Sequence, residues 1–281
     1  KALEEYGFDI LVYLQSSLDI AAQKKALVLL IKVLENIDGF RKEQAEELRK
    51  LSYAFKASPV IIGETTKTMK LEKGVMYNRY DIPAITLETF KEALEGVYPE
   101  KVFSKGRIIA EVAGEELQKL REKRNVSVEE LASQVNLTKE SIYLYEKEKM
   151  RVKYDIAKRI EELLNAEIIK KHGPFEIVKE KISEPHSSLA DKLILFDFEV
   201  TSFKKLNFDL IAQDPRHRVV IKEHTVRNPE KIFDFSDFFE AFLAFIADEG
   251  KKKLPVISPE ELKELGSKRD FLRLIRERSN L

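Results

Sequence analysis

The stretch from residue 115 to residue 165 constrains the fold of this chain most, because its apolar spacing predicts several short helices with very short connections. Ser127 is a predicted N-cap, and Glu130 three residues later completes a capping-box pattern. Thr138 is the predicted cap of the next helix, and Asn136 lies just before it, where a left-handed turn residue is favoured. The helices are predicted near 115–124, 128–135, 139–148 and 153–164.

A turn of only three residues joins the second and third of these helices. Small Ala132 at the predicted crossing and Leu137 at the corner are typical of a helix-turn-helix. The segment 117–146 resembles a helix-turn-helix of the Cro/C1-repressor type, although that type has Gly where this chain has Asn136. Three further positions match the type: Ile142 and Tyr145, which face inward, and Glu146, its usual acidic residue.

The resemblance implies that this module binds double-stranded DNA. In the Cro/C1 type, the N-terminal part of the second helix enters the major groove, and capping hydroxyls contact phosphates. On that basis Lys139 can read guanine, and Glu140 can accept a hydrogen bond from cytosine. The residues at the DNA-contacting positions are Ser127, Thr138, Lys139, Glu140, Ser141 and Leu144. A module used for dimerisation or protein contact is the alternative interpretation.

The charge of the chain limits how such a module can hold DNA. The 281 residues include 49 Lys and Arg and 49 Asp and Glu, so the formal net charge is zero. Within 115–165, eleven basic residues are balanced by eleven acidic ones. A global basic field is therefore missing, and contact with nucleic acid must come from local patches. One candidate patch for the DNA backbone is Arg216-His217-Arg218.

The two flanks of this module share a pattern that indicates an internal duplication. In both flanks an Asp and a Lys stand 13 positions apart, within similar apolar stretches. The similar pairs of stretches occur in the same order along each flank, which favours duplication over chance. They are 18–23 and 208–213, then 28–32 and 218–222, then 58–62 and 254–258.

Both flanks also predict the same order of elements: three strands, a helix and a further strand. The first has strands near 8–14, 18–23 and 27–34, a helix near 40–56 and a strand at 59–63. The second has strands near 193–202, 206–213 and 217–226, a helix near 234–248 and a strand at 254–258. Its helix would carry an apolar stripe, which favours a core over an interface. The stripe consists of Phe235, Phe238, Phe239, Phe242 and Phe245.

This order of elements resembles the core of PD-(D/E)xK nucleases, such as Holliday-junction resolvases and restriction enzymes. In an active member, an Asp and a carboxylate two residues before the Lys hold Mg²⁺. The matching residues are Asp19 and Lys32 in the first flank, and Asp209 and Lys222 in the second. The middle position is Leu30 or Val220, and an aliphatic side chain cannot ligate a hard cation. The prediction is therefore a vestigial centre without metal, cofactor or catalytic residues, in which Asp and Lys form an ion pair.

The whole arrangement is similar to that of a group of archaeal helix-turn-helix transcriptional regulators of the Cro/C1 type. Three stretches, 29–38, 57–64 and 79–85, carry this resemblance, which is strongest over 1–165. The predicted fold class is α+β and multidomain, with two duplicated βββαβ restriction-endonuclease-like domains flanking an all-α helix-turn-helix. The expected parts are a first nuclease-like domain at 1–100, the helix-turn-helix domain at 101–166, a linker at 167–190 and a second nuclease-like domain at 191–281. A short hairpin is expected near 103–112, turning at Lys105-Gly106.

The expected function is sequence-specific binding of duplex DNA in transcription regulation. A homodimer is expected, because paired recognition helices match two half-sites. The nuclease-like domains would dimerise or contact the DNA backbone without cutting, so the protein is not expected to be an enzyme. Two alternatives remain open: a structure-selective DNA-binding protein or nuclease of the resolvase and restriction-enzyme type, and a protein-interaction scaffold.

Composition excludes several other classes. Cysteine is absent, which excludes disulfides, thiolate zinc sites, iron–sulfur clusters and cysteine catalysis. No run approaches the roughly 18 apolar residues of a membrane helix, so a cytoplasmic protein is expected. The four histidines show no helical metal-ligand spacing. They are His172, His186, His217 and His224.

Overall fold

A computed structural model describes residues 2–179, 187–224, 229–248 and 254–279, so His186 lies outside the described residues. The chain divides into two compact units. One consists of Lys1–Lys32, Phe40–Pro59 and Phe175–Leu281, and the other of Val33–Gly39 and Val60–Pro174. Among the described helices, none has the length and apolar character needed to cross a membrane.

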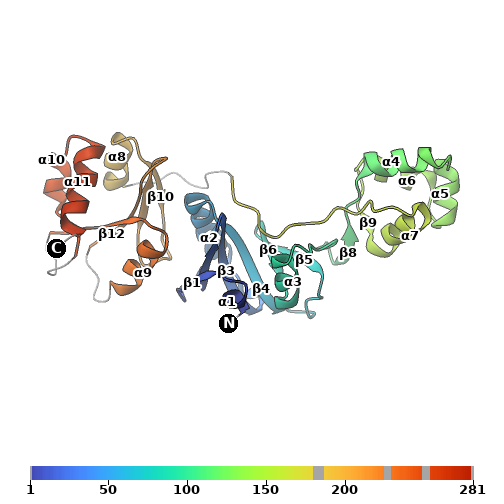
Figure 1. The fold of residues 1–281 in the computed structure, drawn as a ribbon, viewed down its shortest axis with the longest axis horizontal. Helices are drawn as coiled ribbons and strands as arrows, with labels where there is room; N and C mark the ends of the chain where they lie inside the picture. The colour runs from blue at the N-terminus through green and yellow to red at the C-terminus, as the bar shows by residue number, and fades with distance from the viewer. Residues whose placement is uncertain (1, 180–186, 225–228, 249–253, 280–281) are drawn as a thin grey trace. The chain divides into compact units, whose positions relative to one another are not determined.

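The first hundred residues form strands β1 to β6 of a mixed sheet, together with helices α1, α2 and α3 (Figure 1). Strands β1, β2 and β3 are consecutive and antiparallel, with Ile20 opposite Ile31 across β2 and β3. The elements in chain order are α1 (Ala2–Glu5), β1 (Asp9–Val12), β2 (Ile20–Lys24), β3 (Leu27–Asn36), a 3₁₀ turn (Ile37–Gly39), α2 (Lys42–Phe55), β4 (Ser58–Thr65), β5 (Val75–Arg79), β6 (Ile82–Ile85) and α3 (Leu87–Leu94). The predicted three strands, helix and strand are therefore confirmed for the first flank.

The expected hairpin and the four short helices follow. The hairpin pairs β7 (Lys101–Ser104) with β8 (Arg107–Ala110), and its turn is at Lys105-Gly106 as predicted. The helices are α4 (Gly114–Lys123), α5 (Val128–Gln134), α6 (Lys139–Glu146) and α7 (Tyr154–Leu164), with β9 (Val152–Lys153) before the last. The strand order of the whole sheet is β1-β2-β3-β4-β6-β5-β7-β8-β9.

The C-terminal residues form a separate five-stranded sheet in the order β10-β11-β12-β13-β14. Figure 1 shows α8, α10 and α11 grouped together, whereas α9 lies apart from them. Apolar residues of these three helices pack with the sheet in one buried cluster that includes Leu193, Leu262 and Phe271. The elements are α8 (Ser188–Leu195), β10 (Glu199–Ser202), β11 (Leu210–Gln213), β12 (Arg218–Glu223), α9 (Glu230–Phe238), β13 (Phe242–Ile246), β14 (Val256–Ile257), α10 (Pro259–Glu264) and α11 (Lys268–Ser279).

Two boundaries predicted for this second sheet are wrong. The expected strand at 193–202 begins as the end of α8, and only Glu199–Ser202 is extended. The expected helix at 234–248 ends at Phe238, because Glu240 adopts a left-handed conformation (φ 51°) and the chain turns into β13. A continuous apolar run such as Phe242–Ile246 has no periodicity that separates a buried strand from a helix.

Because β13 is a strand and not part of a helix, different stretches of the two flanks correspond to each other. Strand β13 is the parallel neighbour of β12 and follows α9, so its place in the order is that of β4 after α2. Strand β14 is parallel to β13, as β6 is parallel to β4. The stretch 254–258 is therefore the counterpart of the β6 region, and its pairing with 58–62 from sequence is wrong.

The first and second flanks contact each other within one compact unit through the ends of α2 and α9. These ends have the same geometry, because Ala57 N donates to Ser52 O at 2.9 Å and Ala241 N donates to Ser236 O at 2.8 Å. By this alignment Phe55 is the counterpart of Phe239, and their ring centroids are 4.1 Å apart. Residues at the same position relative to the two helix ends therefore contact each other.

The phenylalanine stripe is divided between two places. Phe235 and Phe239 are buried against Tyr13 and Phe55 of the first flank, and Phe245 is buried on β13. The expectation of a core position holds for these residues, but two of them fill the contact between the flanks. Hydrogen bonds surround this aromatic cluster: Tyr13 donates to Asn207, Lys50 to Ser202 O at 2.9 Å, and Tyr53 to Glu199 at 2.5 Å.

Candidate nucleic-acid interface and nuclease-like centres

The helix-turn-helix has the local geometry that its sequence predicts. Ser127 Oγ accepts a hydrogen bond from Glu130 N at 3.1 Å, and Glu130 Oε2 accepts one from Ser127 N at 2.7 Å. Thr138 Oγ1 accepts from Ser141 N at 3.3 Å at the start of α6. Asn136 is left-handed (φ 55°), which satisfies the turn between α5 and α6.

A buried core holds these helices together. Ala132, Ile142 and Tyr145 are in this cluster, as the sequence predicts, together with Leu117, and Leu137 packs against it. The apolar spacing within 153–164 predicts one stripe that includes Ile160, Leu163 and Leu164; Ile160 and Leu164 are buried, but Leu163 is exposed. The module therefore presents α6 from a fixed scaffold, which is a requirement for reading DNA.

Glu146 has a structural partner that the sequence pattern does not reveal. Arg121 Nε donates to Glu146 Oε1 at 2.6 Å, and both side chains are buried. The hydrogen bond to Glu146 raises the pKa of Arg121 above its usual value. A Cβ at Gly114 would lie 2.4 Å from Glu146 O, so only glycine allows α4 to approach α6 this closely. The pair therefore fixes the end of α6 against α4.

The predicted DNA-contacting residues lie on or beside α6. Ser127, Thr138, Lys139 and Glu140 are exposed, whereas Ser141 and Leu144 are half-buried. Lys139 Nζ lies 3.9 Å from Glu129 Oε1, and both side chains are mostly exposed, so this ion pair is weak and easily exchanged for a phosphate or a base.

Glu140 is held ionised at the beginning of α6. A hydrogen bond from its own backbone N–H and one from the Thr138 hydroxyl hold the pKa of Glu140 below its usual value. An ionised carboxylate only accepts hydrogen bonds, so Glu140 can accept from a cytosine amino group and repels phosphate.

Two exposed residues of this face were not singled out from the sequence. Tyr143 is 52% exposed, and Lys147 Nζ lies 6.0 Å from the centre of its ring. Lys139, Tyr143 and Lys147 follow one another at intervals of four, which places them on one face of a helix. This spacing is the sequence signal by which Tyr143 and Lys147 could have been predicted as part of the exposed face.

The two predicted Asp–Lys pairs are formed, one in each sheet. Lys32 Nζ lies 2.8 Å from Asp19 Oδ1, and Lys222 Nζ lies 2.9 Å from Asp209 Oδ1. Asp19 immediately precedes β2 and Asp209 immediately precedes β11, so both lie one position outside the observed strands, although the sequence predicts them inside strands. Their backbone N–H groups also donate equivalently, Asp19 N to Ile31 O at 3.0 Å and Asp209 N to Ile221 O at 2.9 Å.

The residues present do not fit a divalent cation at either centre. Leu30 and Val220, at the positions where an active nuclease has a carboxylate, are fully buried. Within the described part of the chain, no group of three or more His, Asp or Glu side chains is placed to hold a metal ion. Mg²⁺ prefers several oxygen ligands, and here one carboxylate is already bonded to a lysine.

The nearby helix α2 does not supply the missing acid. Glu47 Oε2 accepts from the backbone N–H of Lys204 at 3.0 Å and of Lys205 at 3.3 Å, and its other oxygen lies 3.5 Å from Lys50 Nζ. Glu46 faces Lys42 at 3.9 Å. Glu47 therefore serves the contact between the flanks.

These observations define a helix-turn-helix protein with a nuclease-like sheet. Residues 1–99 match the family model of the PD-(D/E)XK superfamily domain, and residues 117–169 match that of the helix-turn-helix. No solved structure matches the chain significantly.

Whole-chain relatives give the family. A protein of Methanothermobacter thermautotrophicus named "putative HTH-type transcriptional regulatory protein" is 33% identical over 95% of this chain and 90% of its own length. Proteins of the same name from Methanobrevibacter smithii and Archaeoglobus fulgidus are 33% and 32% identical over 96% and 93% of this chain, and 92% and 89% of their own lengths. The chain belongs to this archaeal family of HTH-type transcriptional regulatory proteins, as the sequence resemblance predicts.

Proposed function

We propose that this protein is a sequence-specific regulator that inserts α6 into the major groove of duplex DNA as a homodimer. The observation that carries the proposal is the exposed face of α6, capped by Thr138 and fixed from behind by the Arg121–Glu146 pair. A helix held by a buried core, with exposed polar side chains at its N-terminal end, is suited to base contact.

We further propose that the two nuclease-like flanks are duplicated folds that pair with each other and do not cut DNA. Support comes from the equivalent Asp–Lys bonds and from the stacking of the equivalent residues Phe55 and Phe239. Because this pairing occupies the ends of α2 and α9, a homodimer would use other surfaces, such as those around the helix-turn-helix.

Lys139→Ala tests the role of α6. Lys119 is a matched control, because it forms the same type of exposed ion pair with Glu115, also at 3.9 Å. We expect Lys139→Ala to weaken binding roughly tenfold at one or two base pairs of a selected site and to relax the preference there. Fluorescence anisotropy with single-base variants of that site measures the effect. If Lys139→Ala and Lys119→Ala behave alike, the recognition-helix assignment is wrong.

The same measurements separate the alternatives. Preference for four-way junctions over linear duplex, independent of sequence, would indicate a structure-selective protein. Absence of any salt-dependent DNA binding would favour a protein-interaction scaffold.

A further inference from the structure

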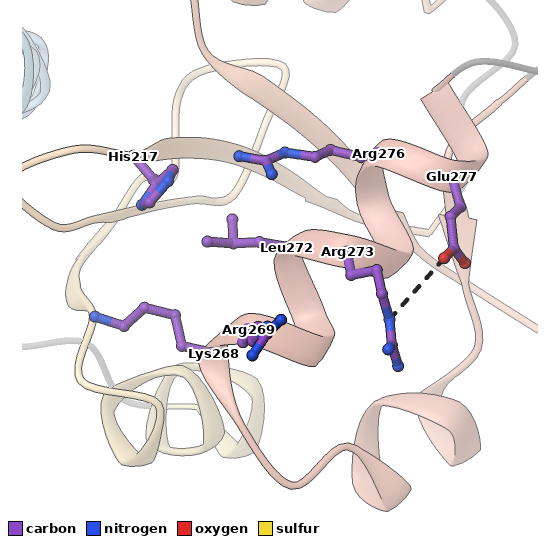
Figure 2. Close-up of a pocket in the computed structure, with 7 residues that line it drawn as sticks. All are labelled: His217, Lys268, Arg269, Leu272, Arg273, Arg276 and Glu277. Carbon is purple, nitrogen blue, oxygen red and sulfur yellow. Dashed lines mark ion pairs between the residues drawn. The ribbon is translucent and has the colours of Figure 1, made fainter.

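The C-terminal domain contains an open groove of about 630 Å³ between α11 and the turn that joins β11 to β12 (Figure 2). Cationic side chains make up most of its lining, and Leu272 supplies an apolar part. Figure 2 shows the side chains of Lys268 and Arg276 extending to the same side as the His217 ring. The lining residues are His217, Lys268, Arg269, Leu272, Arg273, Arg276 and Glu277.

Helix α11 concentrates positive charge in a chain whose net charge is zero. It contains five basic and two acidic residues. Arg269, Arg273 and Arg276 follow at intervals of four and three, which places them along one face of the helix. Seven residues of helix span about 10 Å, so the cations form a row and not a single point.

Part of this charge is neutralised at one end of the groove. Asp214 accepts from Lys268 Nζ at 3.2 Å and lies 3.1 Å from His217 Nδ1. Arg273 lies 3.3 Å from Asp270 and 3.9 Å from Glu277, the second pair being the dashed line in Figure 2. These pairs position the side chains at the edges of the groove.

Two guanidinium groups remain available. Among the described residues, Arg269 and Arg276 have no acidic partner, and Arg276 lies over the Phe242 ring at 5.2 Å. Both guanidinium groups are exposed, so an anion can reach them. Guanidinium groups bind phosphate oxygens with two parallel hydrogen bonds.

We propose that this groove binds consecutive phosphates of the DNA backbone and gives the chain a second DNA contact, on a different domain from α6. The proposal rests on the proposed function, because it assumes that the protein binds duplex DNA. A row of cations about 10 Å long exceeds a single phosphate and matches a strand, in which several phosphates follow one another. Backbone contacts of this kind are independent of sequence.

The test is the double variant Arg269→Ala, Arg276→Ala of the full chain, measured by anisotropy with a selected duplex and a scrambled duplex at several salt concentrations. The control is Lys67→Ala, Lys91→Ala, which removes the same charge from two exposed residues elsewhere. Arg269→Lys, Arg276→Lys keeps the charge and removes the bidentate geometry.

We expect Arg269→Ala, Arg276→Ala to weaken binding to both duplexes roughly tenfold, with the sequence preference unchanged. The slope of log affinity against log salt concentration should become about 2 less steep. The lysine pair should recover the slope and only part of the affinity. If the alanine pair and the control pair have the same affinity and slope, the groove does not bind the backbone.

Failure of the groove and failure of the recognition helix give different results. If Lys139→Ala leaves the sequence preference unchanged while Arg269→Ala, Arg276→Ala lowers affinity for both duplexes, the recognition-helix assignment is wrong and the groove proposal is supported. If Arg269→Ala, Arg276→Ala leaves affinity unchanged while Lys139→Ala alters the sequence preference, the groove proposal is wrong and the recognition-helix assignment is supported. If wild type binds no duplex, both proposals fail.

Discussion

The Asp–Lys pair of the N-terminal sheet is more enclosed than its counterpart in the C-terminal sheet. The side chains of Lys32 and Asp19 are 10% and 14% exposed, whereas those of Lys222 and Asp209 are 20% and 31% exposed. Lys32 also donates to Gln15 O at 3.2 Å, in the loop that contacts the second flank. The same two residue types at the same spacing thus form a structural brace in one sheet and a more open pair in the other.

The largest expected effect comes from breaking the enclosed pair. Asp19→Ala leaves the Lys32 ammonium buried with one carbonyl partner, so we expect a loss of about 3 kcal/mol in the free energy of unfolding. Chemical unfolding followed by circular dichroism measures it. The double variant Asp19→Leu, Lys32→Met removes both charges and should be less destabilised than Asp19→Ala. A double variant that is no better than Asp19→Ala would show that the cost is not an unpaired charge.

Asp209→Ala makes the same change in the open pair and should cost less, about 1 to 2 kcal/mol. Water reaches Lys222 more easily after the change, although Glu223 N loses its 2.7 Å bond to Asp209 Oδ2. The same unfolding measurement gives the comparison directly. Equal losses for the two variants would contradict the difference in burial.

A smaller loss of stability is expected when acid protonates Asp214 in the C-terminal domain. Burial opposes ionisation of Asp214, but hydrogen bonds from Arg216 N, from His217 and from Lys268 outweigh it and hold its pKa below the usual range. The folded-state pKa therefore lies below the unfolded value of about 3.9, so Asp214 stabilises the fold above that pH and the contribution is lost as the pH falls through the folded-state pKa. Thermal unfolding from pH 7 down to acid measures this loss.

Asp214→Asn should be less stable than wild type at neutral pH and should lose less stability on acidification. Asp237→Asn, at an exposed position of α9, is the control. If Asp214→Asn and wild type lose stability in parallel as the pH falls, the carboxylate does not carry this pH dependence.

We expect neither wild type nor Asp19→Ala to cut DNA. With Mg²⁺ or Mn²⁺ and supercoiled, linear or junction substrates, wild type and Asp19→Ala should leave the strands equally intact, because each centre offers one lysine-bonded carboxylate. Metal-dependent cutting by wild type that Asp19→Ala or Asp209→Ala abolishes would overturn the proposal that the flanks are inactive.

The parts that the sequence predicts well are those with local signals. Caps at Ser127 and Thr138, the left-handed Asn136 and the turn at Lys105-Gly106 all depend on residues a few positions apart, and all are confirmed. The Asp–Lys pairs are also predictable, because their spacing of 13 fits two antiparallel strands and the turn between them.

Other parts depend on contacts between distant residues. The sequence predicts a helix at β13 because Phe238, Phe242 and Phe245 follow one another at intervals of four and three, the spacing of one helix face. Pairing with the neighbouring strand β12 makes this stretch a strand instead. The Arg121–Glu146 pair and the stacking of Phe55 on Phe239 join residues 25 and 184 positions apart, which no local pattern reports. The row of arginines on α11 is visible in the sequence, but the groove beside His217 is not.

The most direct test of the central claim is selection of a random duplex library by the wild-type protein at about 150 mM salt, followed by sequencing. If α6 reads DNA in a homodimer, the retained duplexes share a two-fold-symmetric motif. Retention without a common sequence, or no retention, would contradict a sequence-specific dimeric regulator.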